Sequence, residues 1–141
     1  DIFHDYSDSK NMATYINNNI EDHSLLIFIN SDRHVSSIPY ITKDLDYYNL
    51  KLDSFQSYIT WNHQNYNSIE YDSTLSKLEE LSTQYNSIYI MLASQFDFYP
   101  IDVIEVRNSL LLNDQIELCY ASLHDTHIIE WFYLYQYKLK T

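Results

Sequence analysis

The chain has 141 residues, of which 45% are hydrophobic, and a formal net charge of −12 from 20 acidic and 8 basic side chains. This length suits one domain, and the apolar content is too high for a disordered chain. The negative charge would repel the phosphates of nucleic acid, so we expect no nucleic-acid partner. No stretch of about eighteen uninterrupted apolar residues occurs, so no segment of this sequence is predicted to span a membrane.

The sequence lacks glycine and contains a single cysteine, Cys119. Without glycine, a phosphate-binding loop of the P-loop or Rossmann type cannot form. Asn and Asp are the next best residues for left-handed backbone positions, so we expect turns at Asn18-Asn19, Asn113-Asp114 and His124-Asp125. One cysteine excludes an internal disulfide and a metal site with several cysteine ligands.

Helical and strand patterns alternate in the first half of the chain. A helix is predicted over residues 9–19, with an N-cap at Ser7 or Asp8. The run SLLIFI (24–29) is typical of a strand that is buried on both faces. The polar sequence NSDRH then offers a cap for a second short helix that ends near Tyr40. Strands are predicted over residues 48–52 and 57–61.

The second half begins with the clearest helix, predicted over residues 74–85, whose inner face carries Leu75, Leu78, Leu81 and Tyr85. The run SIYIMLA (87–93) is a second apolar strand. Pro100 suits the first turn of a further helix that extends to about residue 112.

The last section reads as two strands, over residues 115–123 and 128–140, joined at HDTH as a hairpin. In the first of these strands, Cys119 is out of phase with Leu118 and Tyr120 and is predicted to be a small packing residue. The whole pattern predicts one α/β domain over residues 1–141. We expect a layered sandwich with a mostly parallel central sheet and a C-terminal antiparallel hairpin.

Polar and aromatic residues follow three of the predicted strands. In open α/β sheets, ligands bind beyond the carboxyl ends of the strands, so these segments are expected to share one rim of the sheet. The predicted ligand-binding residues are Asp32, Arg33 and His34 in NSDRH, Trp61, His63 and Tyr66 in WNHQNY, and Asp97 in SQFDFYP.

Aromatic faces beside amides and carboxylates suit contact with a carbohydrate or a polyprenyl-linked sugar. The competing interpretation is structural: NSDRH is a helix cap with a surface ion pair, and WNHQNY is a loop whose amides replace glycine in turns. His124 and His127 have the spacing of a helical metal chelate but fall at the predicted hairpin tip, so no metal and no cofactor is predicted. The sequence also lacks a nucleophile elbow and an acid/base pair, and no catalytic residue is assigned.

The order of the segments carries a resemblance. DSKNMATYI is followed by LLIFI, SDRHVSSIPYI, YITWNHQNY, a leucine-rich helix, IYIMLAS, FDFYPIDVIEV and finally EWFYLYQYKLK. This layout resembles the soluble C-terminal domain of bacterial membrane glycosyltransferases of the protein-mannosyltransferase and aminoarabinose-transferase type. That family often ends on an aromatic strand of the form F-x-L-Y-x-L, which residues 132–139 nearly match.

The resemblance implies an accessory domain, cut from a longer membrane protein, that caps a membrane active site using a polyprenyl-phosphate-linked sugar donor. The catalytic carboxylates of the family lie in loops between its membrane helices, so none is assigned here. The implied partners are the membrane-embedded portion of the same polypeptide and the lipid-linked sugar or its acceptor, at the extracytoplasmic (periplasmic) face of a bacterial inner membrane. Two alternatives remain: a stand-alone non-catalytic binding or protein-interaction module, and a small hydrolase or transferase that uses NSDRH.

Overall fold

Two apolar runs, one from each half of the chain, form neighbouring parallel strands. The computed structural model describes residues 8–28, 40–51, 53–56, 69–95, 101–122 and 130–138. The two runs are β1 (Leu25–Phe28) and β4 (Ile88–Gln95), and they pair from Leu25 opposite Ile88 to Phe28 opposite Met91. Around them the described residues form α1 (Ser9–Asn19), β2 (Asp46–Asn49), β3 (Ser54–Gln56), α2 (Tyr71–Leu81), α3 (Ile101–Leu111), β5 (Ile116–Ala121) and β6 (Glu130–Tyr137).

The six strands form one mixed sheet in the order β3-β2-β1-β4-β6-β5. The prediction of a mostly parallel sheet is not confirmed, because parallel pairing joins only β2, β1 and β4, whereas the other three pairings of described strands are antiparallel. Chain length explains part of this pattern. A parallel connection needs about a dozen residues or more, and only residues 50–53 separate β2 from β3. The C-terminal strands β5 and β6 are adjacent and antiparallel, as the predicted hairpin requires.

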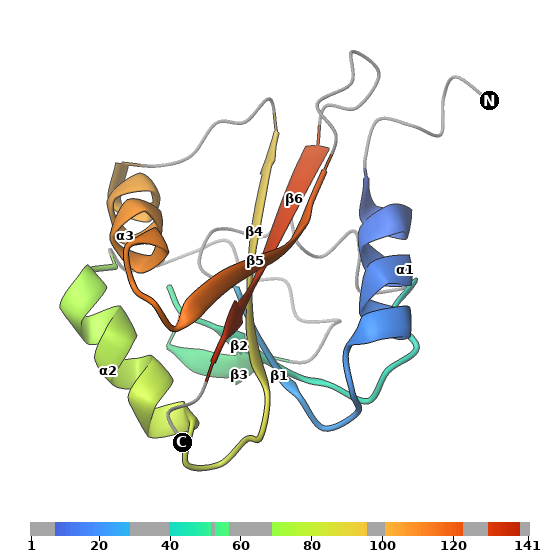
Figure 1. Cartoon of the computed structure of the whole chain (residues 1–141), viewed down its shortest axis with the longest axis horizontal. Coiled ribbons are helices and arrows are strands. Elements are labelled where there is room, and N and C mark those ends of the chain that lie inside the picture. Colours follow the sequence, from blue (N-terminus) through green and yellow to red (C-terminus); the bar gives the residue numbers. More distant parts are fainter. Residues whose placement is uncertain are drawn as a thin grey trace.

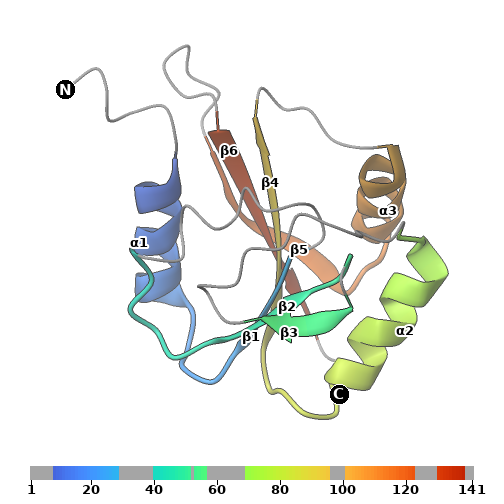
Figure 2. The ribbon, with the colours of Figure 1, turned by 180° about the vertical axis from the view of Figure 1, so that it is seen from behind.

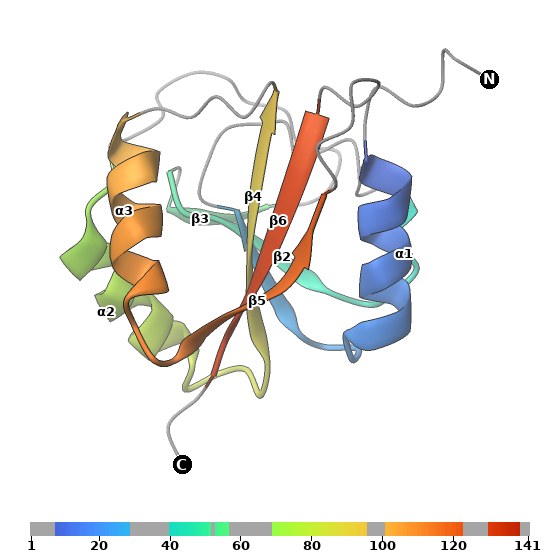
Figure 3. The same cartoon turned by 45° about the horizontal axis from the view of Figure 1, so that its top comes forward.

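Helices cover both faces of the sheet, with α1 on one side and α2 and α3 on the other (Figures 1 and 2). Because successive strand residues point to opposite faces, β1 sends Leu25 and Ile27 toward the α2–α3 side and Leu26 and Phe28 toward the α1 side. One apolar cluster therefore lies on each side of the strands. Figure 3 shows the helices that cover these two sides of the sheet. This arrangement explains why the central runs contain no polar alternation.

The three helices lie close to their predicted positions. α1 has the predicted bounds, and α3 ends one residue earlier than expected. α2 starts at Tyr71 rather than residue 74 and ends at Leu81, so Tyr85 lies beyond the helix. The predicted short helix after β1, the strand over residues 57–61 and the HDTH turn lie outside the described residues.

Two predictions about strands are wrong in detail. The second strand was expected over residues 48–52, but β2 ends at Asn49, and the chain turns before Asp53, whose φ is 51°. Asp53 thus fills a left-handed position in place of glycine, as does His23 with a φ of 67°. In β5, the register shifts between Leu118 and Tyr120, so the simple alternation around Cys119 fails. Both Cys119 and Tyr120 pack against the cluster on the α1 side.

Replacing Leu78 with alanine is expected to lower the free energy of unfolding by about 2–5 kcal/mol, because its side chain is 1% exposed and the substitution leaves a cavity under α2. The matched control is Leu112→Ala, since Leu112 is 87% exposed, and its effect should stay within about 0.5 kcal/mol. Urea unfolding followed by circular dichroism measures both. Equal effects of the two substitutions would contradict the packing of α2 on the sheet.

Candidate functional site

The seven residues predicted to bind a ligand lie outside the residues that the structure describes. These are Asp32, Arg33, His34, Trp61, His63, Tyr66 and Asp97. Two strands that precede some of them are described: β1 and β4 run in parallel, so their carboxyl ends point toward the same edge of the sheet. That these side chains share one rim and bind a ligand remains a prediction.

A group of aromatic and charged side chains does lie within the described residues, where β2 and β3 pass beside α2. We call this group the β2–β3 cluster, and it consists of Asp46, Tyr48, Asp53, Phe55, Lys77 and Tyr85. Its position follows from strand pairing. Tyr48 on β2 lies opposite Phe55 on β3, so the two side chains share one face of the sheet.

Three rings form the apolar part of the β2–β3 cluster. The ring centroids of Tyr48 and Phe55 are 5.2 Å apart in an edge-to-face arrangement, and those of Phe55 and Tyr85 are 6.5 Å apart. Tyr48 is buried, whereas the Phe55 side chain is 51% exposed. The cluster therefore presents one aromatic ring to solvent beside two tyrosines that hold it in place.

Hydrogen bonds orient a carboxylate beside each of these tyrosines. The Tyr48 hydroxyl donates to Oδ1 of Asp53, and the Tyr85 hydroxyl donates to Oδ2 of Asp46 at 2.6 Å. The Lys77 ammonium lies 3.4 Å from Oδ1 of Asp53 and 5.8 Å from the centroid of the Tyr48 ring. One cation thus contacts both a carboxylate and an aromatic face.

These contacts set the protonation states of the cluster. Burial, followed by the hydrogen bond to Asp53, raises the pKa of Tyr48 to about 12. Burial, followed by the hydrogen bond to Asp46, raises the pKa of Tyr85 to about 12. The hydrogen bond from Tyr48 lowers the pKa of Asp53, and Lys77 adds to that effect. At neutral pH the two phenols are therefore protonated donors, and Asp53 is an ionised acceptor.

This arrangement contains the kinds of groups that contact sugars in proteins. The exposed ring of Phe55 offers an apolar surface for the C–H face of a pyranose, and oriented carboxylates can accept hydrogen bonds from its hydroxyls. The sequence predicted this chemistry at other residues and missed Asp46 and Phe55. A signal was present: in a chain without glycine, Asp53 can take the left-handed position of a turn, and such a turn folds Phe55 back beside Tyr48.

A second polar group joins the start of α1 to the end of β5 and the start of β6. Asp8 is 3% exposed, and its carboxylate accepts hydrogen bonds from Asn11 Nδ2 at 2.8 Å, from Ser122 Oγ at 2.6 Å and from the Tyr120 hydroxyl. Ser122 Oγ in turn accepts from the N–H of Phe132 at 2.8 Å. A buried carboxylate with three donors is well satisfied, so we interpret this group as a structural tether.

Cys119 lies near this tether and is partly buried. Burial raises the pKa of its thiol, which disfavours the reactive thiolate at neutral pH. This environment agrees with a packing role for the cysteine.

Comparisons with known proteins identify no family for the chain: no family model, no curated protein and no solved structure matches it. Within the described residues, no three His, Cys, Asp or Glu side chains are grouped so that they could hold a metal ion. The helices in that same part of the chain are too short or too polar to cross a bilayer.

Raising the pH from 10 to about 12 is expected to destabilise the fold, because the pKa of Tyr48 rises from 10.0 in the unfolded chain to about 12 in the folded one. The stabilising effect of the protonated phenol is fully present below pH 10 and is lost as the pH rises through about 12. In Tyr48→Phe, the free energy of unfolding should therefore fall less steeply over this interval. Other tyrosines with raised pKa values retain the remaining dependence, among them Tyr47, Tyr85, Tyr89 and Tyr120.

Urea unfolding at a series of pH values tests this prediction. Around neutral pH, where Asp53 is ionised and the tyrosines are protonated, the variant and the parent protein should depend on pH alike, which serves as the internal control. If the free energy of unfolding fell equally steeply with pH in both proteins above pH 10, burial and the contact with Asp53 would not be what keeps Tyr48 protonated.

Proposed function

We propose that this chain is an accessory extracytoplasmic domain of a polytopic membrane glycosyltransferase that uses a polyprenyl-phosphate-linked sugar donor. In this proposal the membrane-embedded portion carries out catalysis. The domain caps the active site and helps to position the donor sugar or the acceptor. The proposal comes from the resemblance in the order of the segments. The structural observation that supports it best is the position of three strands in the sheet.

That observation is the adjacency of the three strand motifs on which the resemblance depends. LLIFI contributes β1, IYIMLAS contributes β4, and EWFYLYQYKLK contributes β6. These strands are consecutive in the sheet, and β4 pairs with β6 along eight residues, from Ile88 opposite Tyr137 to Gln95 opposite Glu130. Segments that lie far apart in the sequence therefore build one core, which agrees with their belonging to a single domain layout.

The β2–β3 cluster supports the proposed contact with a sugar. It combines the half-exposed ring of Phe55 with carboxylates that Tyr48 and Tyr85 hold in fixed orientations. Pre-oriented acceptors beside an aromatic surface reduce the entropic cost of binding a polyhydroxylated ligand. The cluster is a binding surface in this proposal, and it performs no chemical step.

A stand-alone interaction module is the second candidate, and the apolar surface near the end of α3 favours it. Leu111, Leu112 and Leu118 are 48%, 87% and 50% exposed, respectively. Such a group of exposed leucines is typical of a surface that contacts a protein or a lipid. A membrane-embedded partner within the same polypeptide would also use such a surface, so the two candidates must be separated by experiment.

The complete reading frame distinguishes the accessory domain from the stand-alone interaction module. We expect the reading frame that contains this chain to encode many additional hydrophobic segments, each about twenty apolar residues long. Sequencing the complete reading frame tests this, and an antibody against the chain should then detect a long protein in the membrane fraction. A short reading frame without such segments would contradict the accessory-domain proposal, and the interaction module would then be preferred.

Phe55→Ala is expected to weaken the binding of simple glycosides by about fivefold, which corresponds to roughly 1 kcal/mol of lost aromatic contact. Titration of the isotope-labelled chain with a panel of methyl glycosides, followed by NMR, measures the affinity. Tyr40→Ala is the matched control, because Tyr40 is 45% exposed and lies outside the cluster. Equal losses in both variants, or the absence of shifts at the β2–β3 cluster, would argue against a sugar site there.

A further inference from the structure

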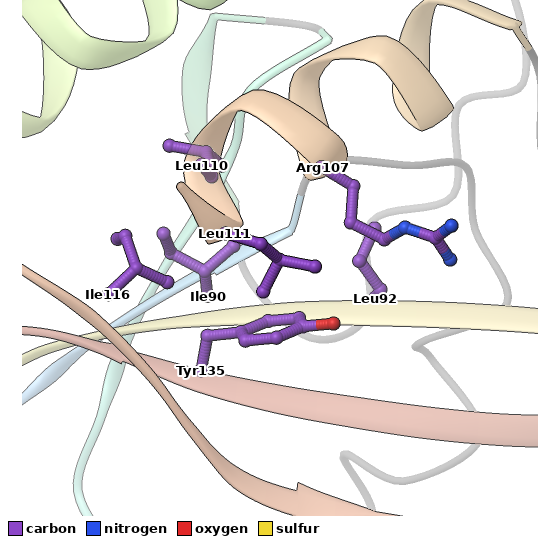
Figure 4. Close-up of a pocket in the computed structure, with 7 residues that line it drawn as sticks. All are labelled: Ile90, Leu92, Arg107, Leu110, Leu111, Ile116 and Tyr135. Carbon is purple, nitrogen blue, oxygen red and sulfur yellow. The ribbon is translucent and has the colours of Figure 1, made fainter. Parts of the chain in front are cut away.

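The hollow between α3 and the sheet belongs to the packing of the core. Its walls are mainly aliphatic, and its two polar side chains, Arg107 and Tyr135, already have interaction partners (Figure 4). It therefore offers no free polar group to a ligand. Oriented polar side chains that reach solvent lie elsewhere on the same side of the sheet, in the β2–β3 cluster.

The β2–β3 cluster contains two pairs of a tyrosine and an aspartate, and both pairs have the same hydrogen bond. The Tyr48 hydroxyl donates to Oδ1 of Asp53, and the Tyr85 hydroxyl donates to Oδ2 of Asp46 at 2.6 Å. Both phenols are protonated at neutral pH, since the pKa of each is raised to about 12. A neutral donor orients a carboxylate but does not compensate a negative charge, so each pair attracts a cation.

The Asp53–Tyr48 pair already holds a cation from the same chain. The Lys77 ammonium lies 3.4 Å from Oδ1 of Asp53 and 5.8 Å from the centroid of the Tyr48 ring. It also lies 3.2 Å from Oε2 of Glu80, so this lysine is engaged on two sides. The fold itself thus shows which group this combination of a carboxylate and a tyrosine ring accepts, namely a primary ammonium.

The Asp46–Tyr85 pair has the same groups but no cation from the described part of the chain. Asp46 is exposed and forms none of the salt bridges found among the described residues. Because Tyr48 lies opposite Phe55, Asp46 is the diagonal neighbour of Phe55 on the same face of the two strands. The ring centroids of Phe55 and Tyr85 are 6.5 Å apart, so an ammonium at Asp46 would lie close to two aromatic rings.

We infer that the Asp46–Tyr85 pair and the ring of Phe55 bind a primary ammonium group, carried by a lysine side chain of a basic partner protein. The carboxylate supplies the ion pair, the rings supply a cation–π contact, and the methylene stem of the lysine lies along Phe55. This inference goes beyond the proposed function, because it requires neither a sugar nor a membrane-embedded portion. Phe55 is shared with the proposed sugar contact, so the two ligands would compete for its ring.

The electrostatics and the exposure of the site favour a protein as the source of the ammonium. A net charge of −12 attracts a basic partner at long range and disfavours a second copy of this acidic chain. Ion pairs and cation–π contacts are individually weak at exposed sites, so a free amine would bind poorly. A lysine that belongs to a protein gains the remaining affinity from the contacts around it.

The test uses N-acetyl-lysine methylamide as the probe in an NMR titration of the isotope-labelled 141-residue chain. We expect saturable shifts at Asp46, Phe55 and Tyr85. The norleucine analogue has a similar hydrocarbon side chain without the ammonium, and it should bind at least about fivefold more weakly. Acetylation of the side-chain amine should weaken the lysine probe in the same way. These comparisons require no variant protein.

A variant then assigns the binding to the Asp46 carboxylate. Asp46→Asn should weaken the lysine probe by about fivefold or more, because it removes the charge but keeps an oxygen that can accept from Tyr85. Asp114→Asn is the matched control. It removes one negative charge at an exposed position between α3 and β5, away from the cluster, and should leave the affinity unchanged.

Carbodiimide cross-linking identifies the source of the ammonium, because it joins a carboxylate directly to an amine in contact with it. In an extract of the cells from which the gene comes, peptide mapping should show Asp46 joined to a lysine of another protein. This product should persist in Asp114→Asn and disappear in Asp46→Asn. Coupling of Asp46 to small amines alone would contradict a protein partner.

Three further results would overturn the inference: no saturable binding of the lysine probe, equal affinity for the lysine and norleucine probes, or equal effects of Asp46→Asn and Asp114→Asn. The last result would mean that only the net charge of the protein attracts the cation. These results are independent of the reading-frame experiment and of the glycoside titration. Binding of the lysine probe by a chain from a short reading frame would retain the ammonium site and remove the accessory-domain proposal. Failure to bind it in a chain from a membrane protein would do the reverse.

Discussion

The parallel pairing of β1 with β4 is the constraint on which the rest of the structure depends. Both strands are apolar on both faces, so neither face can be left in water. Helices must cover the sheet on both sides, and α1 covers one face while α2 and α3 cover the other. The backbone of β1 is bonded on both edges, since Leu25 N–H donates to Ser87 C=O and Leu50 N–H donates to Phe28 C=O. The described residues of β1 therefore contribute only apolar side chains to the centre of the sheet.

Polar and partly exposed groups are displaced to the margins of this core. The β2–β3 cluster lies at one end of the strand order, and the hydrogen bonds from Tyr120 and Ser122 to Asp8 lie at the other, at the end of β5. The two groups face opposite sides, because Tyr48 belongs to the apolar cluster on the α2–α3 side, whereas Tyr120 packs against the cluster on the α1 side.

Local signals predicted the elements well where periodicity was strong and burial was complete. The amphipathic spacing of Met12 and Ile16 was sufficient for α1, whereas Asp8 at the N-cap position makes no side-chain hydrogen bond to the backbone of the helix. The same reasoning failed at β2, because the alternation of Tyr48, Leu50 and Leu52 continues past the point where the chain turns. The expected alternation also failed at Cys119. A bulge arises from the pairing of two strands, so the residue pattern of one strand does not reveal it.

The sequence by itself determined the α/β class, the positions of the three helices and the two central strands, since these follow from local periodicity and from apolar runs that must be buried. It did not determine that antiparallel pairings outnumber parallel ones among the described strands, because pairing depends on how the connections return the chain to the sheet. Only the tertiary structure brought Phe55 beside Tyr48 and Tyr85, and Asp8 beside Tyr120 and Ser122. Such contacts join residues from different elements. They could not be predicted from the sequence, because no local pattern encodes the distance between residues that lie far apart in the chain.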